Sequence, residues 1–104
     1  MGLFDILFGK RNNEVKEVLD RGAMIIDVRT VQEFKMGKVQ GSINIPLEQL
    51  THKMGKIKKY KKPIVLCCAT GSRSAAAMGV LRNAGISEVY NGRSWNKVNR
   101  LLNQ

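Results

Sequence analysis

The fold is indicated first by the stretch Pro-Ile-Val-Leu-Cys-Cys-Ala-Thr-Gly-Ser-Arg-Ser at residues 63–74. Its first half is a continuous apolar run, which is typical of a strand buried on both faces of a parallel sheet. A polar turn over Ala69–Ser72 follows, and the apolar spacing beyond it predicts a helix over Arg73–Asn83, with Gly85 as its stop. The stretch therefore predicts a strand, a tight turn and a helix, which together form one unit of an α/β fold.

The same alternation continues on both sides of this unit. Further strands are predicted at Ala23–Val28, Ser42–Ile45 and Glu88–Asn91. Caps and helical spacing predict four more helices: one from Asn13 to Gly22, one from the capping box Thr30–Glu33 to Gly37, one that includes Leu47, Leu50, Met54 and Ile57, and one that begins at Ser94 and turns Trp95, Val98, Leu101 and Leu102 to the core. We therefore expect one parallel sheet covered on both faces, in a domain of residues 13–104 preceded by an N-terminal apolar segment, residues 1–12.

Length and composition exclude several classes of protein. The chain has 104 residues, of which 43% are hydrophobic and 25% charged, a balance typical of one globular domain. The two cysteines, Cys67 and Cys68, are adjacent and cannot form a disulfide framework. With His52 as the one histidine, neither a Ser-His-Asp enzyme nor a multi-histidine metal site is expected, and we predict no metal or other cofactor.

The basic charge is concentrated in the second part of the chain. The formal net charge is +10, and residues 34–104 carry thirteen basic side chains against two acidic ones, Glu48 and Glu88. The densest stretch, His52–Lys62, contains six lysines. Such a surface attracts anions, and an acidic protein is a candidate partner. No nucleic-acid motif accompanies the lysines, so we interpret them as a solvated surface and do not expect nucleic acid as a partner.

The first eight residues lack a positively charged start and include Asp5, so they do not resemble a secretory signal. We expect their leucine and phenylalanine side chains to pack onto the domain rather than to lie on a membrane. No apolar run is long enough to cross a bilayer. These features predict a cytoplasmic monomer.

The candidate nucleophile is Cys68, which follows the buried strand and precedes the helix, where parallel sheets bind ligands. A cysteine in this place lies at the positive end of the helix dipole, and N–H groups of the turn can point at its sulfur. Arg73 adds a positive charge, and Gly71 permits the tight backbone. All these effects favour a thiolate. Cys67 points to the opposite face by strand alternation and is predicted to be a small buried hydrophobe.

Three motifs, in this order, resemble those of single-domain rhodaneses, a family of sulfurtransferases. They are Ile26-Asp27-Val28-Arg29-Thr30 with Glu33-Phe34, then Gly37-Lys38-Val39-Gln40-Gly41-Ser42-Ile43-Asn44-Ile45-Pro46, and the loop Cys68–Arg73 followed by Ser74. The resemblance covers about residues 13–102. It implies a rhodanese-like three-layer α/β/α domain with a central parallel sheet of about five short strands.

The resemblance also implies the chemistry. Cys68 would take a sulfane sulfur from thiosulfate or another persulfide donor, become a persulfide, and pass the sulfur to a thiol or cyanide. Substrate would be bound by the loop residues Ala69, Thr70, Gly71, Ser72 and Arg73. Asp27 and Arg29 would brace this loop through ion pairing, or form a strand-end salt bridge with no chemical role.

The chain departs from the family pattern at three places. Lys38 stands where the family usually has histidine, Ala69 where it often has arginine, and Gly92-Arg93 where it commonly has a pair of glycines. The alanine weakens the local positive field for thiosulfate. A sulfur-relay or protein-binding module with little turnover is therefore an alternative function.

A second alternative function follows if Cys67, rather than Cys68, is taken as the first residue of the loop. Counted from Cys67, the loop has the Cys-x5-Arg spacing of cysteine-dependent phosphatases and some arsenate reductases. The strand needs Cys67 as its last apolar member, however, and no aspartate in the loop offers a general acid. Both observations favour Cys68 as the nucleophile.

Overall fold

The structure is a computed structural model that describes residues 3–104, with side chains described from residue 12 onward. Helices and strands alternate along it as the sequence predicts. In chain order they are α1 (Leu3–Asp20), β1 (Met24–Asp27), α2 (Val31–Met36), β2 (Ile43–Asn44), the 3₁₀ turns η1 (Leu47–Gln49) and η2 (Thr51–Lys53), α3 (Met54–Lys59), β3 (Ile64–Cys68), α4 (Ser72–Asn83), β4 (Val89–Ser94) and α5 (Trp95–Leu102).

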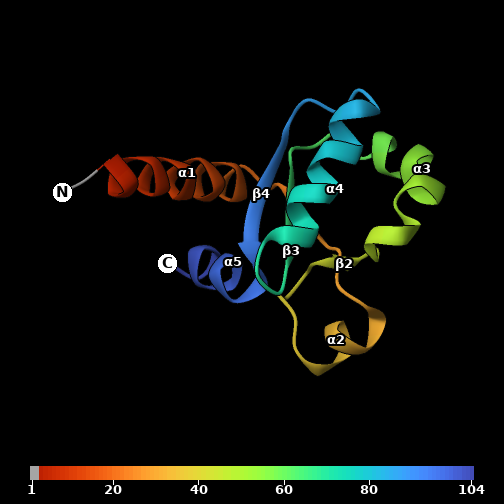
Figure 1. Ribbon diagram of the computed structural model, residues 1–104, viewed down its shortest axis with the longest axis horizontal. Coiled ribbons are helices and arrows are strands. Elements are labelled where there is room, and N and C mark those ends of the chain that lie inside the picture. The colour runs from red at the N-terminus through yellow and green to blue at the C-terminus, as the bar shows by residue number, and fades with distance from the viewer. Residues whose placement is uncertain (1–2) are drawn as a thin grey trace.

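The strands form one parallel sheet in the order β2-β1-β3-β4, with β3 in its interior. Helices α1 and α5 cover one face, and α4 covers the other beside α3, whereas α2 lies beyond the carboxyl ends of the strands (Figure 1). The three-layer α/β/α architecture is therefore confirmed. The number of about five strands that the resemblance implies is corrected to four within residues 3–104, the same four that the apolar runs predict, because the rest of that chain forms helices, turns and loops.

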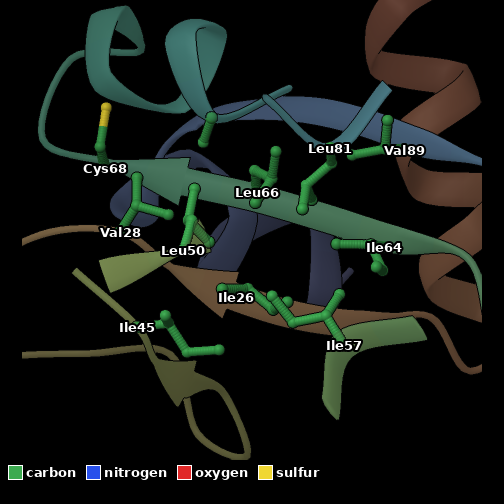
Figure 2. Packing of buried hydrophobic residues seen from close by; sticks show 11 residues of the cluster. Ile26, Val28, Ile45, Leu50, Ile57, Ile64, Leu66, Cys68, Leu81 and Val89 are labelled. Carbon is green, nitrogen blue, oxygen red and sulfur yellow. The ribbon is translucent and has the colours of Figure 1, made fainter. Parts of the chain in front are cut away.

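Strand alternation divides the core into two clusters. Ile26, Leu66 and Cys68 face α4, and Figure 2 shows this cluster along β3. Val65 and Cys67 face α1 and α5 instead. The predicted separation of the two cysteines is thus confirmed. Burying one such aliphatic side chain contributes about 1.5–3 kcal/mol, so both faces of β3 hold it in place.

The predicted start of the first helix at Asn13 is wrong, because α1 runs without a break from Leu3 to Asp20. Asn13 is exposed in the interior of the helix, where a polar side chain can point to solvent and needs no cap. The predicted end at Gly22 is confirmed by its φ of +86°. The division after residue 12 stays a prediction. The leucine and phenylalanine side chains of the first eight residues, expected to pack onto the domain, lie outside the described residues.

The single helix predicted through Leu47 and Ile57 is wrong, since η1, η2 and α3 replace it. Leu47 and Leu50 are three residues apart, a spacing that one 3₁₀ turn satisfies as well as an α-helix. The predicted burial is nevertheless found, because Leu50 and Ile57 are both in the core. Over residues 3–104 no helix has the length and apolarity needed to cross a membrane.

The capping predictions are confirmed at two helices. Thr30 forms a full capping box with Glu33 at the start of α2, with Glu33 N–H to Thr30 Oγ1 at 3.1 Å and Thr30 N–H to Glu33 Oε1 at 3.0 Å. Ser94 Oγ accepts a hydrogen bond from the Lys97 N–H at 3.1 Å and caps α5. Both caps lie near the carboxyl end of the sheet, so they help to fix the positions of α2 and α5 there.

Two glycines test how tightly β4 is packed. A Cβ at Gly92 would lie 2.5 Å from Val98 Cγ2 and 2.8 Å from Val65 Cγ1, whereas nothing lies within 4 Å of a Cβ at Gly79 in α4. We expect Gly92→Ala to lower the free energy of unfolding by about 1–3 kcal/mol through overpacking. The matched variant Gly79→Ala should raise it by up to about 1 kcal/mol, because alanine is the better helix former. Urea unfolding measures both, and equal stability of the two variants would contradict the packing of β4.

Candidate active site

Cys68 is the last residue of β3 and lies where the chain turns into α4. Its backbone pairs with Ser94 at the end of β4, so the first turns of α4 and α5 both begin next to it. Figure 2 shows its sulfur pointing away from β3 into the turn that leads to α4. The side chain is buried, with an exposed fraction of 0%. The positive end of the α4 dipole therefore lies at a cysteine removed from bulk water.

Donors of the turn converge on the Cys68 sulfur. The Gly71 N–H donates to Sγ at 2.9 Å and the Ser74 N–H at 3.4 Å, and Ser74 Oγ lies 3.4 Å from Sγ. Burial raises the pKa of Cys68, but hydrogen bonds from the Ser74 hydroxyl and from the N–H groups of Ser74, Gly71 and Thr70 outweigh it and hold the pKa below its usual value. The geometry therefore favours a thiolate at Cys68.

The left-handed backbone of Gly71 makes this convergence possible. Its φ is +111°, as the prediction of a tight turn requires, and its own N–H is the shortest contact to the sulfur. A Cβ at Gly71 would lie 3.3 Å from Arg93 Cβ, so the neighbouring strand also leaves little space for a side chain. Arg93 itself has a φ of +70°, a conformation that glycine adopts with less strain.

Asn91 holds the turn from β4, a role that the sequence did not indicate. Its Oδ1 lies 2.6 Å from Ser74 Oγ and accepts the Arg93 N–H at 2.9 Å, and its Nδ2 donates to the Gly71 carbonyl at 3.3 Å. Asn91 therefore binds to both residues, Gly71 and Ser74, whose groups touch the Cys68 sulfur. Its place at the end of the predicted strand Glu88–Asn91 was visible, but the β-bulge next to it, at the pairing with Leu66 and Cys67, was not.

The remaining loop residues are placed differently. Ala69, Thr70 and Ser72 are exposed, so they border the surface above Cys68. Cys67 lies on the opposite face of the sheet, where burial, together with the charge of Asp27, raises its pKa to about 12. The cysteine of the Cys-x5-Arg spacing, Cys67, is therefore a buried neutral thiol whose sulfur lies on the other face of the sheet from the loop.

Arg73 forms an ion pair with Glu33 of α2. Its Nη1 donates to Glu33 Oε1 at 2.7 Å and its Nη2 to Oε2 at 3.0 Å. The Arg73 guanidinium and the Thr30 backbone N–H lower the pKa of Glu33 to about 2, so the pair exists throughout the neutral range and is lost only as the pH falls toward that value. The sequence marked Glu33 as a capping residue and gave no sign of this partner, which is forty positions away.

Asp27 and Arg29 form a buried ion pair on the Cys67 side of the sheet. Arg29 Nη2 lies 2.6 Å from Asp27 Oδ2, and the same guanidinium donates to the carbonyls of Glu33 and Gly37 and lies 4.9 Å from the centre of the Trp95 ring. Within the described residues, none of its hydrogen bonds reaches the loop 69–73 directly. Arg29 binds the backbone of α2, and Glu33 of α2 binds Arg73, so the pair is connected to the loop only through α2. Bracing of the loop by Asp27 and Arg29 therefore stays a prediction.

Removing a hydrogen-bond partner from the sulfur should weaken the thiolate. In Ser74→Ala we expect the pKa of Cys68 to rise, with its acid dissociation constant falling about tenfold, the ratio that a charged hydrogen bond of about 1.5 kcal/mol gives. The ultraviolet absorbance of the thiolate, followed against pH in Cys67→Ser backgrounds, measures this change. Ser87 is an exposed serine at the other end of β4, so in the control variant Ser87→Ala the Cys68 thiol should titrate as in the parent. An unchanged titration of Cys68 in Ser74→Ala would refute the role of Ser74 in stabilising the thiolate.

The Asp27–Arg29 pair offers a stability test. Arg29→Met would leave the Asp27 carboxylate buried without its cation, and should lower the free energy of unfolding by about 3–5 kcal/mol. The exposed arginine of α5 provides the control, because Arg100→Met should change stability by less than about 0.5 kcal/mol. Urea titrations at neutral pH compare them. A loss below about 1 kcal/mol in Arg29→Met would mean that the pair does not hold α2.

Known proteins share both the sequence and the fold. The chain is 42% identical over 71 residues to the uncharacterized protein YqhL of Bacillus subtilis. The match covers 68% of this chain and 56% of YqhL, so the chain spans little more than half of the length of YqhL. It is 30% identical over 77 residues to the thiosulfate sulfurtransferase GlpE of Ectopseudomonas mendocina, covering 74% of this chain and 70% of GlpE.

A solved structure extends the likeness to the backbone. The rhodanese-related protein of Thermoplasma volcanium superposes with a TM-score of 0.66 at 31% identity, covering 81% of this chain and 80% of that one. A family model described as the rhodanese-like domain matches residues 11–94, which include β1, the loop after β3 and all of β4. The chain therefore belongs to the rhodanese-like domain family.

Proposed function

We propose that the protein is a sulfurtransferase in which Cys68 carries the sulfur. The Cys68 thiolate attacks the sulfane sulfur of thiosulfate, the S–S bond of the donor breaks, and sulfite leaves with the bonding electron pair. The product is a Cys68 persulfide. With a protonated alkyl persulfide as donor, the same attack releases an alkyl thiolate. Relatives named thiosulfate sulfurtransferase and tRNA sulfurtransferase support rhodanese-type sulfur transfer.

One observation carries the proposal. The Gly71 N–H, at 2.9 Å, and the two groups of Ser74 surround a sulfur whose pKa lies below its usual value. A thiolate is the form that attacks a sulfane sulfur, so no general base is required. The same N–H groups are arranged to stabilise the negative charge of a persulfide, as they stabilise that of the thiolate.

The second half of the reaction regenerates the enzyme. An acceptor thiolate or cyanide attacks the outer sulfur of the Cys68 persulfide, and the Cys68 thiolate leaves. Ala69 and Thr70 are exposed at the surface above Cys68, so an acceptor would approach across them. The two half-reactions require a donor that provides a sulfane sulfur and an acceptor that is a soft nucleophile.

A sulfur relay with slow turnover is the second candidate function. Two observations favour the relay. Cys68 has an exposed fraction of 0%, and Arg73 is bound to the Glu33 carboxylate rather than available to an anionic substrate. A protein partner that displaces part of the loop would then deliver or remove the sulfur. Fast release of sulfur to cyanide favours the enzyme, whereas stable sulfuration without release favours the relay.

Mass spectrometry of the intact protein tests the proposed nucleophile. After incubation with thiosulfate, the wild type should gain the mass of one sulfur atom, and cyanide should remove it. Cys67→Ser should gain the same mass because its sulfur lies on the other face of the sheet. Cys68→Ser should gain none, and thiocyanate production should fall at least about a thousandfold, as expected when an enzyme loses its nucleophile.

The opposite pattern would contradict the proposal. Loss of the added sulfur in Cys67→Ser alone would assign the chemistry to the other cysteine. No gain of sulfur in any of the three proteins, with thiosulfate or with an alkyl persulfide, would remove sulfur transfer as the function. Circular dichroism of Cys68→Ser shows whether the variant keeps the wild-type fold.

A further inference from the structure

The positive charge of Arg73, at the start of α4, is already paired with a carboxylate. Both Nη atoms of Arg73 are used by the two carboxylate oxygens of Glu33, at 2.7 and 3.0 Å. Such a bidentate pair is the strongest geometry that arginine forms with a carboxylate. The Glu33 carboxylate, and to a smaller extent the Cys68 thiolate, raise the pKa of Arg73, so its charge acts on the sulfur and on Glu33 together.

Glu33 is fixed in place independently of Arg73. Its Oε1 accepts the Thr30 N–H at 3.0 Å, its own N–H donates to Thr30 Oγ1 at 3.1 Å, and its carbonyl accepts from Arg29 Nη1 at 3.3 Å. The Glu33 carboxylate is therefore held by α2, and it occupies both Nη atoms of Arg73 that could otherwise bind an anionic ligand. Its side chain is 37% exposed and that of Arg73 34%, so both can be reached by a solute.

The electrostatic consequence depends on the charge of the donor. Thiosulfate carries two negative charges, and it must approach the Cys68 thiolate while the charge of Arg73 is occupied by the Glu33 carboxylate. Asp27 and Arg29 compensate one another in a separate buried pair, so they add no net charge. A donor with one negative charge fewer meets correspondingly less repulsion.

We infer that Glu33 is a specificity-determining residue, which holds Arg73 and thereby makes this site select sulfur donors with a low charge over the thiosulfate dianion. The inference rests on the proposed function. It places Glu33 as a positioning residue, since it acts on the donor through Arg73. It also makes a monoanionic or uncharged sulfane-sulfur compound the expected class of donor.

Two small donors separate charge from size. Thiosulfate and methanethiosulfonate transfer the same sulfane sulfur, and a methyl group in the second replaces one charged oxygen of the first. The Cys68 thiolate breaks the S–S bond in each, releasing sulfite from one and methanesulfinate from the other. Because the leaving groups differ, each variant is compared with the wild type by the ratio of its two kcat/KM values, with cyanide as acceptor.

Glu33→Gln is the decisive variant, because it removes the charge and keeps an oxygen for the Thr30 N–H. We expect its KM for thiosulfate to fall about fivefold, the effect of one charge at a partly exposed site, with kcat within about twofold. Its KM for methanethiosulfonate should fall less, by about twofold. Glu88→Gln removes the same charge at the opposite end of β4, and should leave the ratio for the two donors unchanged.

The double variant Glu33→Gln with Arg73→Gln restores a pair with no net charge. If the charge of Arg73 causes the lower KM for thiosulfate in Glu33→Gln, the ratio of the kcat/KM values for the two donors should return to about the wild-type value. A donor ratio that is unchanged in Glu33→Gln would overturn the inference. An equal loss of kcat with both donors in the single and the double variant would also overturn it, since the pair would then be only structural.

The wild type distinguishes this inference from the proposed function. Sulfur added to Cys68 by both donors, with an unchanged donor ratio in Glu33→Gln, would sink the role of Glu33 and leave sulfur transfer standing. Sulfur added by neither donor would refute both together. Thermal unfolding of each variant identifies any that does not fold. Should Glu33→Gln be such a variant, Glu33→Asp serves in its place. It keeps the charge, but its shorter side chain no longer holds Arg73 in two hydrogen bonds, so the donor ratio should shift towards thiosulfate as in Glu33→Gln, by a smaller factor.

Discussion

The short turn between β3 and α4 must point several N–H groups at a single sulfur atom, and much of the surrounding structure serves that requirement. Gly71 meets it with a φ of +111°, which places its N–H 2.9 Å from Cys68 Sγ. Asn91 holds the turn from β4, and Ser74 completes it from the first turn of α4. Without these partners the buried thiol would be neutral, as Cys67 is one residue earlier.

The neighbouring cysteines show how the environment decides reactivity. They have the same side chain, they are adjacent, and each is fully buried. Cys67 faces an apolar layer and the Asp27 carboxylate, and its pKa rises to about 12. Cys68 suffers the same kind of desolvation, yet hydrogen bonds from the turn reverse its effect. Direction of the side chain from the strand, rather than exposure, therefore separates a packing residue from a candidate nucleophile.

Ion pairs connect the site to elements that are distant in sequence. Asp27 and Arg29 hold α2, and Glu33 on α2 holds Arg73 at the start of α4. Three elements are thus joined by two pairs, one buried and one partly exposed. The buried pair is expected to serve stability, because breaking it leaves a charge without solvent. The partly exposed pair can be reached by a solute, and we propose that its charge balance bears on the choice of sulfur donor.

Local patterns were enough to predict the strands, the caps Thr30 and Ser94, and Cys68 between a strand and a helix, because each depends on neighbouring residues only. The start of α1 and the 3₁₀ turns were missed, since an exposed asparagine and a three-residue spacing fit more than one conformation. Partners such as Glu33 for Arg73 and Asn91 for Ser74 are set by how the strands pair and where the bulge in β4 lies. Those contacts join residues far apart in the chain, so only the assembled sheet could bring them together.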